Sequence, residues 1–492
     1  MGIINDNKYK VEKFASYLKH YGVVRLAGKA VSKLIDRDEY ESRWQELVTD
    51  TETLNRQKQE WFSYMPMVSI LVPVFNPPKE YLKEMLLSVI NQTYFRWQLC
   101  IVDAGDEKLE DFIAEVTKND ERIKYQAIEN KGIAGNTNVA LEMARGDYIA
   151  LLDNDDIITP DALYRMVEMI NKENCDCVYS DEDKVDSNNH KHFRPHIKPD
   201  FNKILLSTNN YICHLFMVKA DIARQVGGFS SEYDGAQDFD FILRCTEKSN
   251  KVGHVSQVLY NWRTHQNSTS ANPLSKKYAY ESGKKAIESY MKRQNISGEV
   301  RMLEDCGFYA IDYTCDKTPK VEIVVLGVNE SSIAKEYFRY LRKNTDYFNM
   351  GICACKEPDE KKLCDIECEY YAVIMAGTLI ENKDWLKKLV AICENNKLKG
   401  AAGKLIIDNY LGYAGIKKKD AFGNIYQNAG KPSWYKGYFN HAILQSNITN
   451  MPKTGIIVKK EEYLSSLREK KPLMSKDNEF AYEPNVVFKR KK

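Results

Sequence analysis

The segment Tyr148-Ile149-Ala150-Leu151-Leu152-Asp153-Asn154-Asp155-Asp156 changes from an apolar run into three carboxylates within a few residues. A continuous apolar run is typical of a strand buried on both faces, and open α/β sheets bind their ligands at the carboxyl ends of such strands. Three acids there repel one another, so we expect a divalent cation that carries a phosphorylated ligand. The alternative is an aspartate-rich loop that caps the next helix, with Thr159-Pro160-Asp161 as its start signal.

Apolar runs of the same kind lie upstream and alternate with helical patterns. Strands are predicted over residues 68–76, 99–103 and 123–128, and helices over 78–91 and 136–144. This alternation predicts a largely parallel sheet with helices on both faces. Asn76, Asp103 and the acids at 153–156 would then share one edge of the sheet.

Length and composition restrict the class of protein. A chain of 492 residues with 43% hydrophobic residues predicts a globular protein of two or three domains. The net charge of +2 argues against a bulk nucleic-acid binder, which would carry a strong basic excess. No apolar run approaches the roughly 20 residues that span a bilayer, and residues 1–10 lack a signal peptide's apolar core, so we expect a cytoplasmic protein.

The N-terminal region has a helical pattern over residues 7–60, and its first half is basic through Lys8, Lys10, Lys13, Lys19, Arg25, Lys29, Lys33 and Arg37. Such a helix would lie on an anionic membrane surface, or it would be a solvated face of a helix that packs on the next domain. The basic residues 489–492 would touch anionic lipid or be disordered. We therefore predict a helical region (1–65), a first α/β domain (66–300), a second domain (301–480) and a basic tail (481–492).

The second domain repeats the pattern of the first. Residues 321–329 match 68–76, and residues 371–380 match 148–157, which places Ala376 and Thr378 where Asp153 and Asp155 stand. Residues 351–355 match 99–103, with Cys355 in place of Asp103. The repeat therefore predicts a second α/β domain of the same kind without the metal ligands.

Two features of this second domain allow alternative interpretations. The cysteines at 353, 355, 364 and 368 have a spacing that suits zinc, but the first two fall in the repeated strand, so packing is favoured. The aromatic side chains of Trp434, Tyr435, Tyr438 and Phe439 would bind a glycan or a partner enzyme, or be buried in a structural platform.

A glycine-bearing turn at residues 129–138 leads into a helix and contains Asn130, Gly132 and Asn136. Helix N-termini of this type favour phosphate-like anions, and the alternative is a plain loop. Asp103 would accept a hydrogen bond from a nucleobase or a ribose, and Gly105 permits close backbone approach.

Five motifs in order carry a family resemblance: VPVFN (72–76), IVDAG (101–105), ENKGIAGNTNVAL (129–141), ALLDNDD (150–156) and GAQDFDFILR (235–244). Together they resemble the nucleotide-sugar domain of glycosyltransferase family 2, over residues 66–300. The resemblance implies a GT-A fold, which is Rossmann-like with a mostly parallel sheet and helices on both faces. It also implies transfer of a sugar with inversion, and it is nearest to bacterial enzymes of O-antigen, capsule or rhamnose-rich polysaccharide synthesis.

The resemblance assigns roles to individual residues. Asp153 and Asp155 form an Asp-x-Asp site for Mn²⁺ or Mg²⁺ and the diphosphate, with His265 as a further metal ligand and Arg263 paired with the diphosphate. Phe75 and Asp103 contact the base. The expected nucleotide and donor contacts are Pro73, Phe75, Asn76, Asp103, Gly105, Asn130, Gly132, Asn136, Asp153, Asn154 and Arg263.

Asp238 matches the catalytic aspartate of the family, the base that takes the proton of the acceptor hydroxyl. Gln237 stands where relatives often have Glu, which puts a helping role at that position in doubt; the alternative for Asp238 is a helix cap. Sugar or acceptor contacts are expected at Asp181, Glu182, Asn210, His214 and Gln237, although the first two would also suit a solvated turn.

The leading hypothesis is a metal-dependent inverting glycosyltransferase that extends a lipid-linked bacterial polysaccharide from a nucleoside-diphosphate sugar. One alternative is a non-catalytic subunit that binds nucleotide sugar or glycan. Another is a nucleotidyltransferase, which would need a glycine-rich, basic phosphate loop near the first strand, and residues 73–78 offer none. The side chains that select the sugar lie in variable loops outside these motifs, so the motifs do not identify the sugar.

Overall fold

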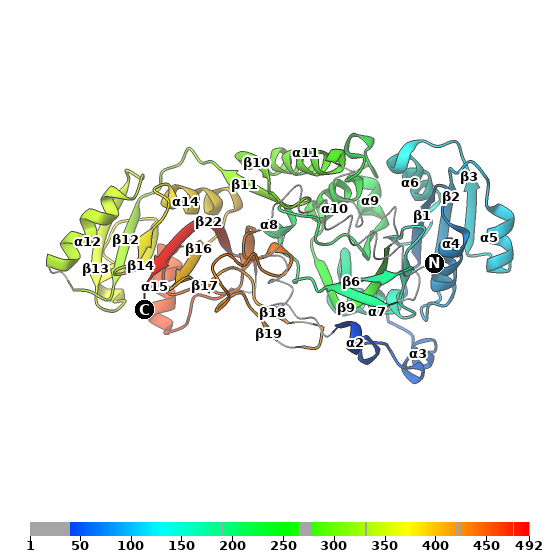
Figure 1. Cartoon of the computed structure of the whole chain (residues 1–492), viewed down its shortest axis with the longest axis horizontal. Coiled ribbons are helices and arrows are strands. Elements are labelled where there is room, and N and C mark those ends of the chain that lie inside the picture. Colours follow the sequence, from blue (N-terminus) through cyan, green and yellow to red (C-terminus); the bar gives the residue numbers. More distant parts are fainter. Residues whose placement is uncertain are drawn as a thin grey trace, which may run out of the picture.

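The computed structural model describes residues 40–187, 191–264, 277–329, 332–419, 421–423, 425–475 and 477–491. Two mixed sheets lie one after the other along the long axis of the molecule, each covered by helices (Figure 1). Within the described residues, no helix combines the length and the apolar character needed to cross a bilayer.

The first sheet begins with the four parallel strands that the sequence predicts. In spatial order they are β3 (Ile123–Ala127), β2 (Trp97–Asp103), β1 (Val68–Val74) and β4 (Tyr148–Leu151). The sheet continues through antiparallel β8 (Phe216–Lys219) to β6 (Cys177–Asp186), β9 (Val252–Thr264) and β5 (Ile157–Ile158), with β7 (His192–His196) beside β6. The predicted α/β fold class is therefore confirmed.

Helices cover both faces of this sheet because alternate strand residues point to opposite sides. Ile70 and Val72 pack with α4 (Lys79–Ile90), α5 (Glu110–Thr117) and α7 (Ala162–Glu173). Leu71 packs with the other helix set, α6 (Gly132–Met143), α9 (Ala220–Gln225) and α10 (Gln237–Lys248). The carboxyl ends of β1, β2 and β4 lie at one edge of the sheet, where a ligand site can form.

The second sheet has the same strand order as the first sheet from β2 onward. It runs β13 (Met350–Cys355), β12 (Val321–Leu326), β14 (Tyr370–Met375), β21 (Ile456–Lys459), β16 (Gly400–Ile407), β22 (Phe480–Arg490) and β15 (Leu379–Ile380). Every neighbouring pair runs in the same relative direction as its counterpart in the first sheet. The pairing also shifts register after Ser180 in β6 and after Gly403 in β16. The repeat predicted from the sequence is thus present at the level of topology.

The strand pairing corrects the alignment of the two copies by one residue. Val68 pairs with Tyr148, whereas Val321 pairs with Tyr370, so Met375 and Gly377 take the places of Asp153 and Asp155. The following turn agrees, since the N–H of Asp156 donates to residue 153 and the N–H of Thr378 donates to residue 375. The predicted placement of Ala376 and Thr378 was wrong because an alignment of apolar letters does not define hydrogen-bond register.

The same pairing corrects the place assigned to Cys355. Pro73 and Leu326 occupy the same position in β1 and β12. Pro73 pairs with Val102 and Leu326 pairs with Cys355, so Cys355 is the counterpart of Val102 and Lys356 is the counterpart of Asp103. Cys353 and Cys355 lie within β13, as the packing interpretation predicts.

The predicted basic tail is a strand for most of its length, so that part of the prediction was wrong. β22 pairs with β16 on one side and with β20 (Ser446–Ile448) and β15 on the other. Phe488 is fully buried, and the ammonium of Lys489 lies 2.8 Å from a Glu381 carboxylate oxygen. Lys489 points outward from the strand, on the face opposite the buried Phe488.

The described chain starts with α2 (Tyr40–Arg43), η1 (Trp44–Glu46) and α3 (Thr51–Gln57). The Tyr40 hydroxyl donates to Asp183 at 2.8 Å, and the Trp44 ring stacks on His192 with centroids 4.0 Å apart. This part of the N-terminal region therefore packs on β6 and β7. The basic residues predicted to lie on a membrane, 8–37, are outside the described residues.

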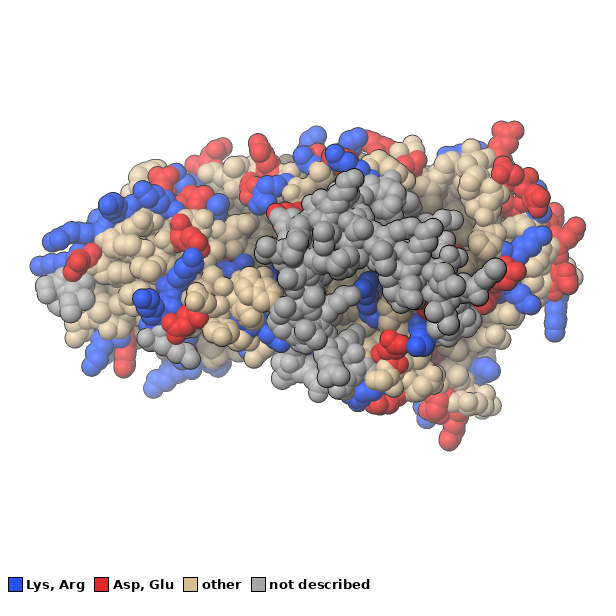
Figure 2. All heavy atoms as spheres, in the orientation of Figure 1, with Lys and Arg blue, Asp and Glu red and all other residues tan. Residues whose placement is uncertain are grey.

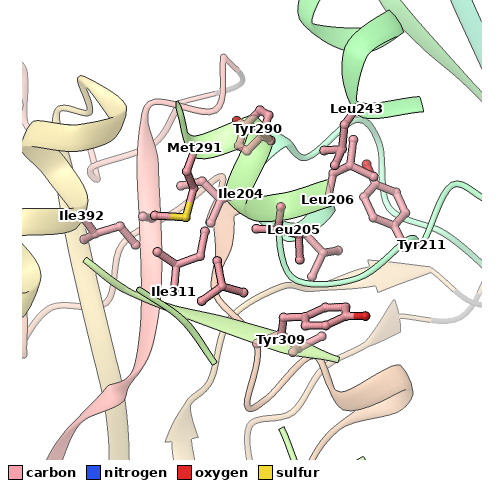
Figure 3. Packing of buried hydrophobic residues seen from close by; sticks show 14 of the residues in the cluster. Ile204, Leu205, Leu206, Tyr211, Leu243, Tyr290, Met291, Tyr309, Ile311 and Ile392 are labelled. Carbon is pink, nitrogen blue, oxygen red and sulfur yellow. The ribbon is translucent and has the colours of Figure 1, made fainter. Parts of the chain in front are cut away.

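One hydrophobic core runs through the junction of the two domains. Figure 3 shows Ile204–Leu206 of α8 (Lys203–Leu206), Leu243 of α10, Tyr290 and Met291 of α11 (Lys277–Gln294), Tyr309 and Ile311 of β11 (Tyr309–Tyr313), and Ile392 of α14 (Trp385–Asn396). The predicted boundary at residue 300 falls in β10 (Gly298–Met302), the partner strand of β11 at this junction. The two domains therefore share buried surface.

Candidate active site

The loop after β4 gives its three carboxylates different environments. The side chain of Asp153 is 49% exposed and Asp155 is half-buried, whereas Asp156 is fully buried. Asp156 accepts hydrogen bonds from the Tyr260 hydroxyl at 2.5 Å and from the Arg263 N–H at 2.7 Å. Burial, and then the negative charges of Asp155 and Asp153, raise the pKa of Asp156 well above its usual range. Asp153 and Asp155 therefore form the outward face of a loop that Asp156 holds from beneath.

Arg263 supports this loop from within the protein. Its guanidinium is fully buried and donates to the Asp155 carbonyl at 2.7 Å and to Glu84 of α4 at 2.5 Å. It also lies over the Tyr81 ring, 4.7 Å from the centroid. The prediction that Arg263 pairs with a diphosphate does not agree with this placement, because the side chain points beneath the loop. His265 lies outside the described residues.

Asp103 is likewise occupied by the protein. It is fully buried and accepts hydrogen bonds from the N–H groups of Gly105 (2.9 Å) and Leu109 (2.8 Å) and from the Tyr125 hydroxyl (2.7 Å). The carboxylate thus satisfies the otherwise unpaired N–H groups of the loop that leads to α5. The structure gives it this task rather than the predicted contact with a base, and the 52% exposed Phe75 stays at the open edge.

The remaining predicted donor contacts are polar groups around this edge. Asn76 and Asp106 exchange two hydrogen bonds, and Asn154 donates to the Pro73 carbonyl at 2.8 Å. At the start of α6, the Asn130 side chain accepts from the Gly132 N–H and from Asn136. These bonds order both loops before any ligand arrives.

His214 lies next to Asp153 and interacts electrostatically with the predicted base, Asp238. Its Nε2 lies 3.7 Å from the Asp153 carboxylate, and its ring stacks on Tyr260 with centroids 4.5 Å apart. Asp238, in the first turn of α10, accepts a hydrogen bond from Asn210 at 3.0 Å. Burial raises the pKa of Asp238, and His214 partly opposes that rise. The structure therefore brings together the predicted residues Asp153, Asn210, His214 and Asp238.

The two acids of β6 are buried, not solvated. Asp181 accepts from the Lys198 N–H at 2.7 Å and lies 2.9 Å from His254 Nε2. It is therefore placed for structure rather than for the predicted sugar contact. The open alternative of a solvated turn is wrong for both acids, since β6 is an inner strand.

Glu182 belongs to a buried charged group next to His214. It accepts from the Lys198 ammonium at 3.1 Å and from the His214 N–H at 3.3 Å, and its other oxygen lies 3.5 Å from His196 Nδ1. Burial alone would raise the pKa of Glu182, but Lys198 and His196 hold it well below its usual range. Gln237 accepts from the Gly235 N–H at 2.9 Å and so stabilises the turn before Asp238.

Several residues of this site were missed in the sequence. Tyr260, Lys198 and His196 fix Asp156 and Glu182, yet they come from segments far along the chain from the acids that they hold. Tyr260 lies three residues before the predicted donor contact Arg263, and this proximity is a signal by which it could have been found.

The described residues contain no group of three or more His, Cys, Asp or Glu side chains that would hold a metal ion by themselves. Asp153 and Asp155 carry hard-oxygen atoms on the same loop, and Mg²⁺ usually binds one or two carboxylates together with substrate phosphates. The residues therefore suit a cation that arrives with a phosphorylated ligand.

The sheet order and the acid-bearing strand edge define an α/β domain of the GT-A type. Residues 69–227 match the family model of Glycosyl transferase family 2. The first domain of this chain belongs to that family.

Curated relatives match about half of the chain. The uncharacterized protein y4gI of Sinorhizobium fredii is 34% identical over 294 residues, which cover 58% of this chain and 32% of that protein. The O-antigen biosynthesis protein RfbC of Myxococcus xanthus is 30% identical over 267 residues, which cover 54% of this chain and 21% of that protein. The chondroitin synthase of Pasteurella multocida is 28% identical over 269 residues, which cover 53% of this chain and 27% of that protein. The chain thus spans about a third or less of the length of these relatives.

Proposed function

We propose that this chain transfers a sugar from a nucleoside-diphosphate sugar to a glycan hydroxyl, with inversion, in bacterial surface polysaccharide synthesis. The observation that carries the proposal is the pairing of two outward carboxylates, Asp153 and Asp155, with the separately held Asp238 across His214. The family of the domain and relatives named as an O-antigen biosynthesis protein and a chondroitin synthase support it.

In this proposal Asp238 removes the proton of the acceptor hydroxyl as that oxygen attacks the anomeric carbon. The bond between that carbon and the diphosphate breaks, and the diphosphate leaves on the side of Asp153 and Asp155. Burial raises the pKa of Asp238, which makes its carboxylate a stronger base at neutral pH, and the bond from Asn210 orients it. Attack from the face opposite the leaving group gives inversion.

Mn²⁺ or Mg²⁺ would be held by Asp153 and Asp155, and when bound it would neutralise charge on the departing diphosphate. Asp156 would not take part directly, because both of its oxygens already accept hydrogen bonds. Its contribution is to hold the loop so that the two outward carboxylates stay in place.

The acceptor in this proposal is a lipid-linked glycan at the cytoplasmic face of the membrane. The basic residues between 8 and 37 would interact with anionic headgroups there, at about 1 kcal/mol per charge near the surface. On the face shown in Figure 2, basic and acidic side chains of the described residues are interspersed, which suits a local rather than a general attraction to anions.

The first experiment measures the thermal stability of the full chain with a panel of nucleoside-diphosphate sugars, with and without Mn²⁺. A ligand that binds only the folded state raises the melting temperature, so one nucleotide class should stabilise the protein in a metal-dependent way. Asp155→Ala should abolish the effect. Asp221→Ala removes a fully exposed carboxylate on α9 and should keep it.

The second experiment measures transfer to glycan acceptors with the donor so identified. Asp238→Asn should lose transfer while it keeps donor-induced stabilisation. Donor binding by the wild-type protein without turnover would favour the non-catalytic binding subunit. No stabilisation by any donor with metal present would contradict the proposal.

A further inference from the structure

A loop of the second domain contacts the first domain directly beside the candidate active site. The Tyr438 hydroxyl accepts from the Ile197 N–H at 3.1 Å and donates to the Pro195 carbonyl. The Phe439 ring stacks on His196, with centroids 3.8 Å apart and planes 10° apart. Tyr435 is 2% exposed, so of the aromatic side chains considered for glycan binding only Trp434 is largely exposed, at 53%.

The stacked histidine leads into the active site through short contacts. His196 Nδ1 lies 3.5 Å from one oxygen of Glu182, and the other oxygen accepts the His214 N–H at 3.3 Å. The His214 ring in turn lies 3.7 Å from the Asp153 carboxylate. A change at Phe439 therefore reaches an outward acid through His196, Glu182 and His214.

The backbone of this loop is held in an unfavourable conformation. Phe439 has φ 46° and Asn440 has φ 63°, in the left-handed region that bulky side chains avoid. Asp305, in the linker segment between β10 and β11, holds it there. One of its carboxylate oxygens lies 2.6 Å from the Lys436 ammonium and 3.3 Å from the Asn440 side-chain nitrogen. Strain of this kind persists where the surroundings over-determine it, and it is frequent at functional sites.

We propose that Phe439 is a positioning residue for sugar transfer: the second domain, through Phe439 and His196, sets the positions of Glu182 and His214 in the first domain. The inference rests on the proposed function. It assigns a part in the reaction to the domain in which Met375 and Gly377 replace the two acids.

The test uses full-length variants and steady-state transfer kinetics. Phe439→Gly removes the ring, and glycine suits the backbone at φ 46°. We expect kcat to fall about 10- to 100-fold with the donor KM nearly unchanged, because a small displacement of catalytic groups lowers the rate rather than donor binding. Phe439→Tyr keeps the stacked ring and should restore kcat. Phe348→Ala, which removes an 82% exposed ring elsewhere in the second domain, should behave as wild type.

A double-mutant comparison separates positioning from general stability. If Phe439 acts through His196, then Phe439→Gly should add little to the loss already caused by His196→Ala. Independent, additive losses would overturn the inference, and so would a variant that changes only KM. If Phe439→Gly does not fold, Phe439→Leu keeps a bulky side chain without the aromatic ring and should show the same kcat loss.

An NMR measurement tests the same contact without activity. With ¹³C-labelled histidine, the ring signal of His196, one of eight histidines, should move in Phe439→Gly and not in Phe348→Ala. An unmoved His196 signal would overturn the inference. A wild-type protein that transfers no sugar from any donor would end the proposed function and this role together. If the wild-type protein transfers sugar and Phe439→Gly is equally active, only the positioning role of Phe439 would be contradicted.

Discussion

Asp155 and Asp156 are adjacent in the chain but differ in what they contact. Asp156 is fully buried and bonded to Tyr260 and to Arg263, whereas Asp155 is half-buried at the outward face. The second domain has Thr378 and Phe488 where the first has Asp156 and Tyr260, so it lacks both sides of this hydrogen bond. The second domain thus lacks both the acids of this loop and the hydrogen bond that supports them.

Replacing each acid should therefore have a different effect on stability. Asp156→Ala leaves the Tyr260 hydroxyl and the Arg263 N–H unsatisfied, so we expect a loss of roughly 3 kcal/mol in the free energy of unfolding. Asp155→Ala should change that free energy by less than about 1 kcal/mol while it removes metal-dependent donor binding. Urea denaturation of both variants measures this, and equal losses would contradict the assignment of the two acids.

Asp238 should show opposed effects on activity and stability. Burial raises its pKa above the unfolded value, so the folded state binds the proton more tightly and stability falls as pH rises through the raised pKa. Transfer needs the carboxylate, so activity should rise over the same pH range. Asp238→Asn should melt higher than wild type at pH 8 and transfer at least about 100-fold more slowly. A variant that melts lower at pH 8 would count against the raised pKa.

At the scale of elements, the irregular end of β6 places charge inside the protein. The register shifts after Ser180 and after Asp181 put Glu182 next to Lys198, whose side chain is fully buried. In the second sheet Lys404 follows the equivalent shift and replaces Asp181. Burial lowers the pKa of Lys404 to about 8. The same backbone thus carries opposite charges in the two copies.

Breaking the Glu182–Lys198 pair should be costly. Lys198→Met leaves a buried carboxylate uncompensated, and we expect a loss of about 3 kcal/mol in the free energy of unfolding. Adding Glu182→Gln removes that charge and should recover part of the loss. Lys248→Met, at an exposed position on α10, serves as the control and should be nearly neutral. Chemical denaturation at pH 7 compares the three, and a double variant less stable than Lys198→Met would argue against the pair.

At the scale of the whole molecule, the two domains are joined by polar contacts as well as by the shared core. Asn202 and Asn447 exchange hydrogen bonds of 2.9 and 2.8 Å, and the Asn447 side chain also accepts from the Ile204 N–H at 3.0 Å. Gln445 bonds both the N–H and the carbonyl of Ile311. The second domain thus fixes backbone groups of the first and of the linker between them.

Loss of the Asn447 side chain should therefore weaken both domains at once. Asn447→Ala leaves the buried Ile204 N–H unsatisfied, which costs roughly 1–3 kcal/mol. We expect a single unfolding transition at lower temperature in calorimetry, because the core is continuous. Asn55→Ala, an exposed amide on α3, is the control. Two separate transitions in the wild-type protein would contradict a shared core.

Apolar periodicity and motif order were enough to predict the four parallel strands of the first sheet, the acid loop after β4 and the existence of a second copy. These features depend on local spacing and burial, which residue types record directly. Asn210, His214 and Asp238 were recognised because their motifs resemble those of a known family.

The contacts that each side chain makes could be determined only from the tertiary structure. The buried states of Asp103, Asp156, Asp181 and Arg263 depend on partners such as Tyr125, Tyr260, His254 and Glu84, which lie 22 to 179 residues away in sequence. Hydrogen-bond register, and not letter matching, placed Met375 and Gly377 in the second copy and made a strand of 480–490. Burial and register are set by distant segments, so composition and spacing cannot report them.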